Sequence, residues 1–317
     1  MRRIRLFSVA VVSACALTLT ACAGSTPQPL VSAGAATEAV TVSGAFGSTP
    51  KVSMATPLVT ETTECNEVIA GNGSRIQSGQ LVSVDLSIYN GSTGKLVSQT
   101  AFDGTDEQRV VYGDKLLPGL YKGLSCASEG SRVVIVVPPG DAFGDAGNSK
   151  WNVSGTDTLV FVLDVQRVYL AAANGTPQLS QDGMPMVVLA PNGQPGITVP
   201  NAAAPTTERI SVLKKGNGAV VTSGQKVTVH YTGVLWKDGT LFDSSWKNGT
   251  PVQFTVGDGV QDQGEVIQGF SNAVIGQTVG SQILAVIPPD LAYGDQAAGS
   301  IPAGSTLVFV IDILGVD

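Results

Sequence analysis

The feature that most constrains this chain is an internal duplication. Three motifs recur in the same order at offsets near 150 residues within a sequence of 317 residues. A repeat of that length has the size of a whole domain and is too long for a solenoid unit. The sequence therefore predicts two copies of one fold. The matching pairs are Ser78–Gln80 with Ser223–Gln225, Val137–Asp145 with Ile287–Asp295, and Thr158–Val162 with Thr306–Val310.

Each copy is predicted to consist mostly of strands. In the second copy, apolar and polar residues alternate over Val227–Tyr231, which is the period of a half-buried strand. Helical spacing of apolar residues occurs in Glu265–Ile275, and Gly276 suits the position that follows a helix. The run Leu307–Leu314 is apolar enough for a central strand. One helix packed on an antiparallel sheet is an α+β architecture.

The N-terminal segment has the form of an export signal. Three arginines within residues 2–5 precede the uncharged apolar run Leu6–Ala21, which is shorter than a membrane-spanning helix. The run ends in Leu19-Thr-Ala-Cys22, which resembles the bacterial lipobox. That resemblance implies removal of residues 1–21 and attachment of lipid to Cys22, so that the protein is anchored to the extracytoplasmic face of the cell membrane. The alternative is an ordinary signal peptide with an incidental cysteine.

Two segments are poor in large apolar residues. Residues 22–59 are rich in Gly, Ala, Ser, Thr and Pro, and we expect them to form a flexible tether. Residues 171–206 contain several Pro, Gly and Asn residues and are predicted to be a linker. Within it, the apolar island Met186–Ala190 is expected to pack on a neighbouring domain. The predicted domains are then 60–170 and 207–317.

Composition excludes several kinds of site. The formal net charge is −7, and no basic run follows residue 5, which argues against nucleic-acid binding. His230 is the only histidine, so a multi-histidine metal site is excluded and no metal or other cofactor is expected. A Ser-His-Asp triad on His230 is conceivable, but neither Ser244 nor Ser245 has an evident base to activate it.

Two cysteines remain after the signal segment. Cys65 and Cys126 are separated by 61 residues, and an exported protein meets an oxidising compartment. A disulfide between them is favoured over two free thiols. Closing a loop of that length would stabilise the fold by a few kcal/mol.

The second copy contains many aromatic residues accompanied by few polar ones. Six of them lie in separate predicted elements, and Asp243 follows one of them directly. Taken singly, each suits a hydrophobic core. Together with two tyrosine hydroxyls and a carboxylate, they also suit a concave apolar site with a few polar anchors. The six are Tyr231, Phe242, Phe254, Phe270, Tyr293 and Phe309.

The motifs of the second copy resemble those of FKBP-type peptidyl-prolyl cis-trans isomerases, in order and spacing. The resemblance covers Glu208–Asp317 and implies a five-stranded antiparallel sheet wrapped around one short helix, with a proline pocket between them. The motifs that carry it are Val229-His-Tyr-Thr-Gly233, Phe242-Asp-Ser-Ser245, Val266-Ile-Gln-Gly-Phe270, Ile287-Pro-Pro-Asp-Leu-Ala-Tyr-Gly294, Ile301-Pro302 and Leu307-Val-Phe309.

Carried over motif by motif, the resemblance implies two sets of site residues. The catalytic set is Tyr231, Phe242, Asp243, Phe270, Tyr293 and Phe309, and the substrate-binding set is Phe254, Val266, Ile267 and Ile301. Four departures from the family pattern bear on activity. Phe270 stands where a tryptophan is frequent, Val252 where an aromatic is common, residues 258–264 form an insertion, and residues 295–300 lack a histidine found in some members.

At the positions that match the site of the second copy, the first copy has neither the two tyrosine hydroxyls nor the carboxylate. Leu86 replaces Tyr231, Ser98 replaces Asp243 and Phe143 replaces Tyr293, while the rest of the lining stays apolar. We therefore expect an FKBP-like fold with little or no isomerase activity in the first domain. The remaining apolar counterparts are Val97, Leu116, Leu117, Leu120 and Phe161.

Two functions are consistent with these residues. One is a membrane-tethered isomerase that assists the folding of exported proline-containing proteins, with the activity in the second domain. The other is a non-catalytic holdase or partner-binding module that uses the same pocket. The polar set favours the isomerase, because a pure holdase does not need it. The resemblance also implies an FK506-type macrolide as an inhibitor.

Overall fold

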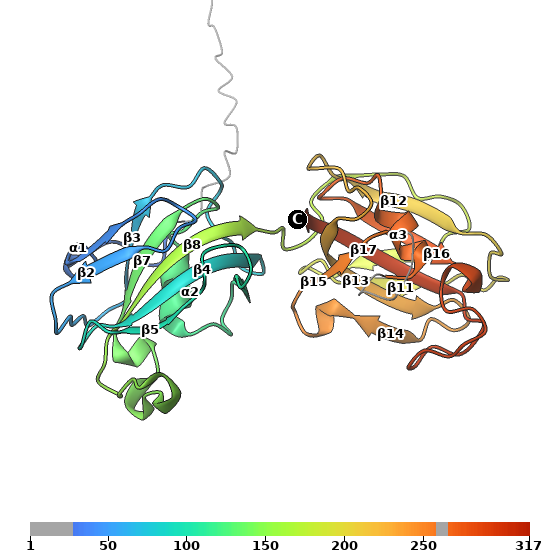
Figure 1. Cartoon of the computed structure of the whole chain (residues 1–317). Helices are drawn as coiled ribbons and strands as arrows, with labels where there is room; N and C mark the ends of the chain where they lie inside the picture. Colours follow the sequence, from blue (N-terminus) through green and yellow to red (C-terminus); the bar gives the residue numbers. More distant parts are fainter. Residues whose placement is uncertain (1–27, 258–265) are drawn as a thin grey trace, which may run out of the picture.

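The computed structural model describes residues 28–257 and 266–317. The chain forms two lobes that are joined by one segment of chain, and each lobe is built on one large antiparallel sheet with a short helix packed against its inner face (Figure 1). This is the predicted α+β architecture with two related domains. None of the helices in the described ranges is long and apolar enough to cross a bilayer.

The first sheet has the strand order β3-β7-β8-β4-β5, with β6 also paired to β4. Because β5 and β6 pair with opposite ends of β4, they form one interrupted edge strand. The sheet therefore has the five strand positions that the sequence predicts. Its strands are β3 (Glu64–Ile69), β4 (Leu81–Asn90), β5 (Leu96–Gln99), β6 (Gln108–Val111), β7 (Arg132–Val137) and β8 (Leu159–Val168).

The second sheet repeats this order as β14-β13-β17-β16-β12, with β15 paired to β13 beside β14 and the short β9 added to β12. Its strands are β9 (Thr176–Pro177), β12 (Arg209–Lys215), β13 (Lys226–Leu235), β14 (Leu241–Ser244), β15 (Val252–Thr255), β16 (Gln282–Ile287) and β17 (Leu307–Val316).

One helix packs on the inner face of each sheet, α2 (Pro118–Leu124) in the first and α3 (Gln268–Val274) in the second. The helix predicted over Glu265–Ile275 is thus shorter, and Gly276 follows it with a φ of 81°. Single 3-10 turns occupy the connections. They are η1 (Pro139–Asp141), η2 (Gly144–Ala146), η3 (Ser149–Trp151), η4 (Ser245–Lys247) and η6 (Pro289–Leu291).

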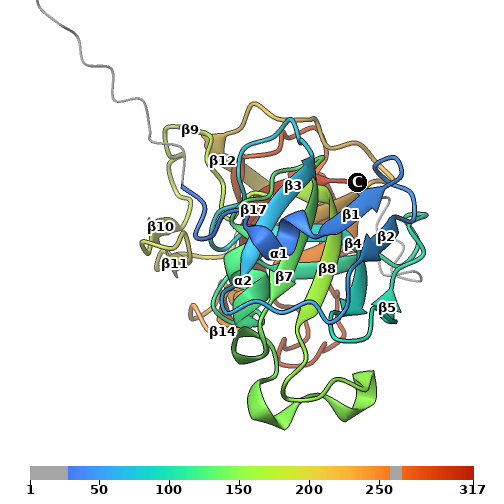
Figure 2. The same ribbon diagram turned by 90° about the vertical axis from the view of Figure 1, so that its left-hand side faces the viewer.

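The prediction of a flexible tether is wrong for residues 28–59. They form α1 (Ala35–Glu38) and a hairpin of β1 (Val40–Ser43) and β2 (Lys51–Met54), which lie over β7 and β8 in Figure 2. Val40 and Leu58 are buried against the outer face of the first sheet. The outer sheet face carries valines, and burying them offsets the ordering of a segment that has few apolar residues of its own.

The prediction of a linker over residues 171–206 is wrong in the same way. It contains a hairpin of β10 (Met186–Leu189) and β11 (Pro195–Thr198), and its apolar island packs on the outer face of the second sheet. Val187 and Ile197 contact the cluster that contains Trp236. Each domain is therefore preceded by a covering hairpin, so the repeated unit extends beyond the motifs that reveal it.

A buried aspartate on the last strand of each sheet holds these segments. Asp164 pairs with Arg132 at 2.5 Å, with both side chains almost fully buried, and accepts a hydrogen bond from Gly47 N at 2.7 Å. Arg132 donates to the carbonyls of Gly44 and Ser48 in the β1–β2 turn. In the second domain, Asp312 accepts a hydrogen bond from Ala173 N at 2.8 Å.

Candidate active site

Strand β13 separates two environments. Tyr231 points to the inner face of the second sheet, towards α3, whereas His230 points to the outer face, as successive residues of a strand must. Gly233, two residues after Tyr231, is required for packing, because a Cβ there would lie 2.4 Å from Cζ of Phe242. The glycine thus allows the Phe242 ring to lie flat against the sheet.

The structure brings all ten predicted site residues around one cavity of about 500 Å³. They come from the inner face of the sheet, from α3 and the segment that leads into it, and from the loop between β16 and β17. Ala298, Gly299 and Ser300 also line the cavity. These three residues were not among the ten that the sequence predicts. They directly precede the predicted site residue Ile301 in the same loop, and this position could have indicated them.

The aromatic rings are arranged edge to face. Phe270 lies at the centre of the lining, with its ring 6.1 Å from Tyr231 and 5.5 Å from Phe309, at interplanar angles of 88° and 87°. Phe242 meets Phe309 at 5.4 Å and 80°. Such contacts hold the rings in fixed orientations, so the cavity has rigid apolar walls. Phe270 and Phe309 are buried, while Phe242 and Phe254 are half-buried.

Three polar side chains interrupt this apolar lining. The hydroxyl of Tyr231 donates a hydrogen bond to Oδ2 of Asp243, and the other carboxylate oxygen accepts one from Ser244 N at 2.8 Å. Burial, followed by the contact with Asp243, raises the pKa of Tyr231. Burial and the nearby charge of Asp243 also raise the pKa of Tyr293. Both phenols therefore keep their protons at neutral pH and remain hydrogen-bond donors.

The expectation that no base lies beside the serines is wrong for Ser245. Its Oγ lies 2.9 Å from Nδ1 of His230, because η4 follows β14 and folds back over the outer face of β13. Burial lowers the pKa of His230 to about 4, and both residues are buried. The same hydroxyl accepts a hydrogen bond from Tyr231 N at 2.9 Å. The pair is therefore a structural contact behind the cavity, away from any substrate.

In the first domain, the counterparts of the site residues pack against its core. Leu86, Leu120 and Phe143 are partly buried there and Phe161 is fully buried. Phe143, which replaces Tyr293, makes an edge contact with Trp151 at 5.5 Å. The counterparts of Tyr231 and Tyr293 are Leu86 and Phe143, which have no hydroxyl, and Ser98 at the position of Asp243 has no carboxylate. The first domain therefore lacks both tyrosine hydroxyls and the negative charge of the second domain's site.

Some of the remaining sequence predictions concern described residues, and others concern residues outside the described ranges. The structure joins Cys65 and Cys126 in a disulfide with a Cα–Cα distance of 6.6 Å. The predicted lipid-attachment residue Cys22 and the predicted insertion over residues 258–264 lie outside the described residues. Within residues 28–257 and 266–317, no group of three His, Cys, Asp or Glu side chains is arranged to bind a metal ion.

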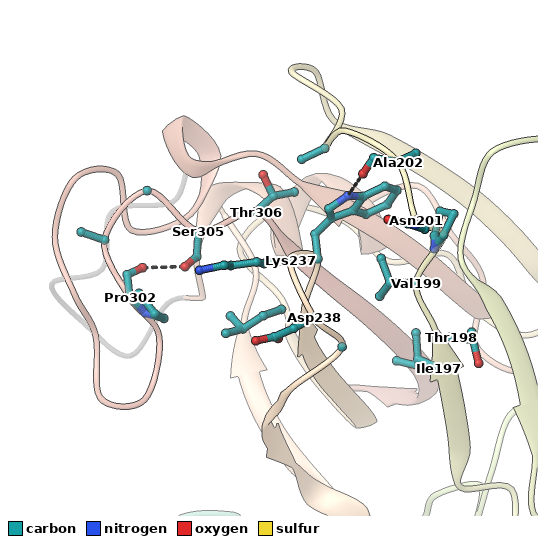
Figure 3. A pocket seen from close by; sticks show the side chains of 17 residues that line it. Ile197, Thr198, Val199, Asn201, Ala202, Lys237, Asp238, Pro302, Ser305 and Thr306 are labelled. Atoms are coloured by element: carbon teal, nitrogen blue, oxygen red, sulfur yellow. Dashed lines mark hydrogen bonds between the residues drawn. The ribbon is translucent and has the colours of Figure 1, made fainter.

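A second, larger hollow of about 840 Å³ lies on the other side of the loop that bears Ile301. It is lined by residues of the segment after β11, by the β13–β14 turn and by Pro302–Thr306 (Figure 3). The indole of Trp236 donates a hydrogen bond to the Ala202 carbonyl at 3.0 Å across its floor. None of the ten predicted site residues lines this hollow.

Comparison with known proteins decides the family. The family described as FKBP-type peptidyl-prolyl cis-trans isomerase matches residues 73–166 and 218–314, which together are more than half of the chain. The chain belongs to this family. Its members are enzymes that interconvert the cis and trans forms of peptidyl-prolyl bonds, and the two matched segments are the two domains described above.

Individual FKBP relatives match either one domain or both. An FK506-binding protein of Streptomyces anulatus is 41% identical over 125 residues, which are 39% of this chain and 97% of the relative. The human peptidyl-prolyl cis-trans isomerase FKBP9 is 31% identical over 232 residues, which are 71% of this chain but only 33% of that protein. The chain thus spans about a third of the length of this second relative.

Solved FKBP structures align at low overall similarity. The three FKBP domains of wheat FKBP73 align over 80% of this chain and 94% of that one, with 22% identity and a TM-score of 0.35. FkpA from Escherichia coli aligns over 43% of this chain and 53% of that one, with 31% identity and a TM-score of 0.32.

Proposed function

We propose that the second domain is a peptidyl-prolyl cis-trans isomerase that acts on exported proteins at the cell envelope. The observation that carries this proposal is the polar set in its cavity. Tyr231, Asp243 and Tyr293 stand among apolar walls in the second domain, whereas the first domain has Leu86, Ser98 and Phe143 at these positions and so lacks both phenols and the carboxylate. An FK506-type macrolide would compete with the substrate for the same cavity.

The mechanism follows from the physics of the amide bond. An X-Pro bond isomerises over a barrier of about 18–20 kcal/mol, because twisting it removes amide resonance. The twisted amide is less dipolar than the planar one. Apolar walls made by Phe242, Phe270 and Phe309 therefore stabilise it relative to the planar ground state. No covalent step is required.

The polar residues orient the substrate in this account. The Tyr293 hydroxyl stays protonated and donates a hydrogen bond to a substrate carbonyl. Asp243 fixes the Tyr231 hydroxyl, and its carboxylate can accept a hydrogen bond from a substrate N–H group. The backbone on either side of the proline is then held while the X-Pro bond rotates.

The competing function is a holdase, which the apolar residues Leu86 and Phe143 at the positions of Tyr231 and Tyr293 favour in the first domain. Replacing Tyr293 by Phe separates the two functions. An isomerase loses turnover of a short X-Pro peptide by roughly tenfold, the effect of one hydrogen bond made in the transition state. Suppression of aggregation of an unfolded protein stays unchanged. No turnover by the parent chain would favour the holdase, and unaltered turnover in the variant would remove Tyr293 from the mechanism.

We also propose that residues 1–21 are removed and that Cys22 carries lipid on the extracytoplasmic side of the membrane. Mass spectrometry of the membrane fraction should detect diacylglycerol on Cys22 and none in Cys22→Ser.

A further inference from the structure

The degenerate first domain contacts the back of one wall of the isomerase cavity. Strand β15 carries Phe254 on its inner face, where the ring lines the cavity. Gln253, the preceding residue, points away from the cavity, and its Oε1 accepts a hydrogen bond from Nη1 of Arg109 at 2.6 Å. Arg109 lies on β6, the edge strand of the first sheet. An edge strand of one domain thus meets an edge strand of the other.

A second group of contacts fixes this arrangement. The hydroxyl of Tyr169 lies 2.8 and 2.9 Å from the two carboxylate oxygens of Asp317, and the Gln253 amide donates to the same carboxylate. Nη2 of Arg109 lies 3.4 Å from Oδ2 of Asp317, and Nε of Arg167 lies 3.8 Å from Oδ1 of the same residue. Asp317 is thus bound by three side chains of the first domain and by the strand that carries Phe254.

Tyr169 is itself anchored in both domains. Its backbone N–H donates to the Leu81 carbonyl of the first sheet at 2.9 Å, and the next residue, Leu170, donates to the Leu314 carbonyl of the second at 3.1 Å. Its buried ring lies against Gly315, where a Cβ would come within 2.5 Å of Cδ1. Burial and the bond to Asp317 raise its pKa to about 12, so the hydroxyl remains a donor.

We infer that Arg109 and Tyr169 of the first domain are positioning residues for the isomerase cavity. They contact Gln253 of β15 and the C-terminal residue Asp317, and through these contacts they hold β15 and its Phe254 in place. The inference rests on the proposed function of the second domain and assigns a task to the first. Lys115 of the first domain makes a further contact just before this strand, since its Nζ lies 3.5 Å from the Asn248 carbonyl in the turn that leads into β15.

The physical reason lies in the sheet topology. Strand β15 has four residues, pairs only with β13 among the described strands, and leaves its outer edge free of sheet partners. A short edge strand with one neighbour is the part of a sheet that opens most readily. Contacts from the first domain replace the missing neighbour and keep Phe254 at a fixed distance from Phe270, now 5.7 Å between ring centroids.

The test compares Arg109→Met and Tyr169→Phe with the parent in the chain from residue 23 onward. Both variants keep their apolar parts, so the fold is preserved. Lys51→Met is the matched control, because Lys51 lies on β2 at the side of the first domain remote from the second (Figure 1). The readouts are kcat and KM for an X-Pro peptide, together with amide hydrogen exchange at Val252–Thr255.

The expected result is a KM raised about three- to tenfold with kcat changed less than about twofold, the size of one or two partly exposed hydrogen bonds. Exchange at Val252–Thr255 accelerates in both variants, and the control matches the parent. An unchanged KM, unchanged exchange, or an equal effect in Lys51→Met would overturn the inference. If the parent itself lacks activity, the proposed function fails, and the exchange measurement alone decides whether the first domain holds β15.

Discussion

His230 and Trp246 stack face to face on the side of β13 opposite to the cavity, with ring centroids 3.9 Å apart and planes inclined by 20°. The covering segment closes this site, since a Cβ on Gly193 would lie 3.1 Å from the Trp246 ring. Asp312, directly across the ladder from His230, has a pKa that burial raises. The histidine is therefore buried, with 3% of its surface exposed.

This enclosure predicts a pH dependence of stability. The pKa of His230 falls from 6.5 to about 4 on folding, because burial penalises its charged form. Below pH 6.5 the unfolded chain binds a proton that the folded chain does not accept until about pH 4. The free energy of unfolding should therefore fall by about 1 kcal/mol between roughly pH 7.5 and pH 5.5. Urea denaturation at the two pH values measures it.

His230→Asn supplies the control for that experiment. His230 is the only histidine, so the variant should lose the histidine-dependent part of the slope over this range. An identical slope in parent and variant would show that His230 titrates normally and is not enclosed as described.

The disulfide should contribute substantially to the stability of the first domain. Cys65 on β3 and Cys126 after α2 close a separation of 61 residues, and both are buried. Replacing both by Ala should lower the free energy of unfolding by about 2–4 kcal/mol, since the unfolded chain gains freedom. Denaturation of the double variant and of the parent measures this difference in the free energy of unfolding. Equal stability of the two under oxidising conditions would contradict a stabilising disulfide.

The Arg132–Asp164 pair should hold the covering segment of the first domain. Asp164→Ala leaves a buried guanidinium without its partner, which costs about 3–5 kcal/mol. The combined Arg132→Met and Asp164→Leu variant should recover part of that loss, because it removes both charges. Limited proteolysis should cut near Gly44–Ser48 in Asp164→Ala first. Resistance equal to that of the parent would contradict the assigned contact.

Sequence patterns identified the fold because its signals are local and repeated. Alternation over Val227–Tyr231 and the duplicated motifs indicate both sheets, and Gly276 marks the end of the helix. The sequence does not predict the covering hairpins, because these segments become ordered only by packing on the outer faces of the sheets. Val40 and Leu58 are isolated apolar residues in a polar segment, and only the outer face of the sheet explains their burial.

The site residues could be predicted where they belong to a sequence motif with a fixed spacing. Tyr231, Asp243 and Phe270 lie in motifs whose spacing survives in this chain, and the structure places them around one cavity. The contact between His230 and Ser245 could not be predicted, because it depends on how η4 folds back over β13. The contact between Arg109 and Gln253 depends on the relative placement of the domains, which leaves no trace in local sequence.

The most direct test of the account compares Asp243→Ala with Ser98→Ala, the same position of the first domain, in the whole chain from residue 23. The measurement is kcat/KM for a short X-Pro peptide. We predict a loss of about ten- to a hundredfold in Asp243→Ala, because a partly buried hydrogen bond to a charged group disappears from the cavity, and less than about a twofold change in Ser98→Ala. Full activity in Asp243→Ala, or a large loss in Ser98→Ala, would contradict the assignment of the activity to the second domain.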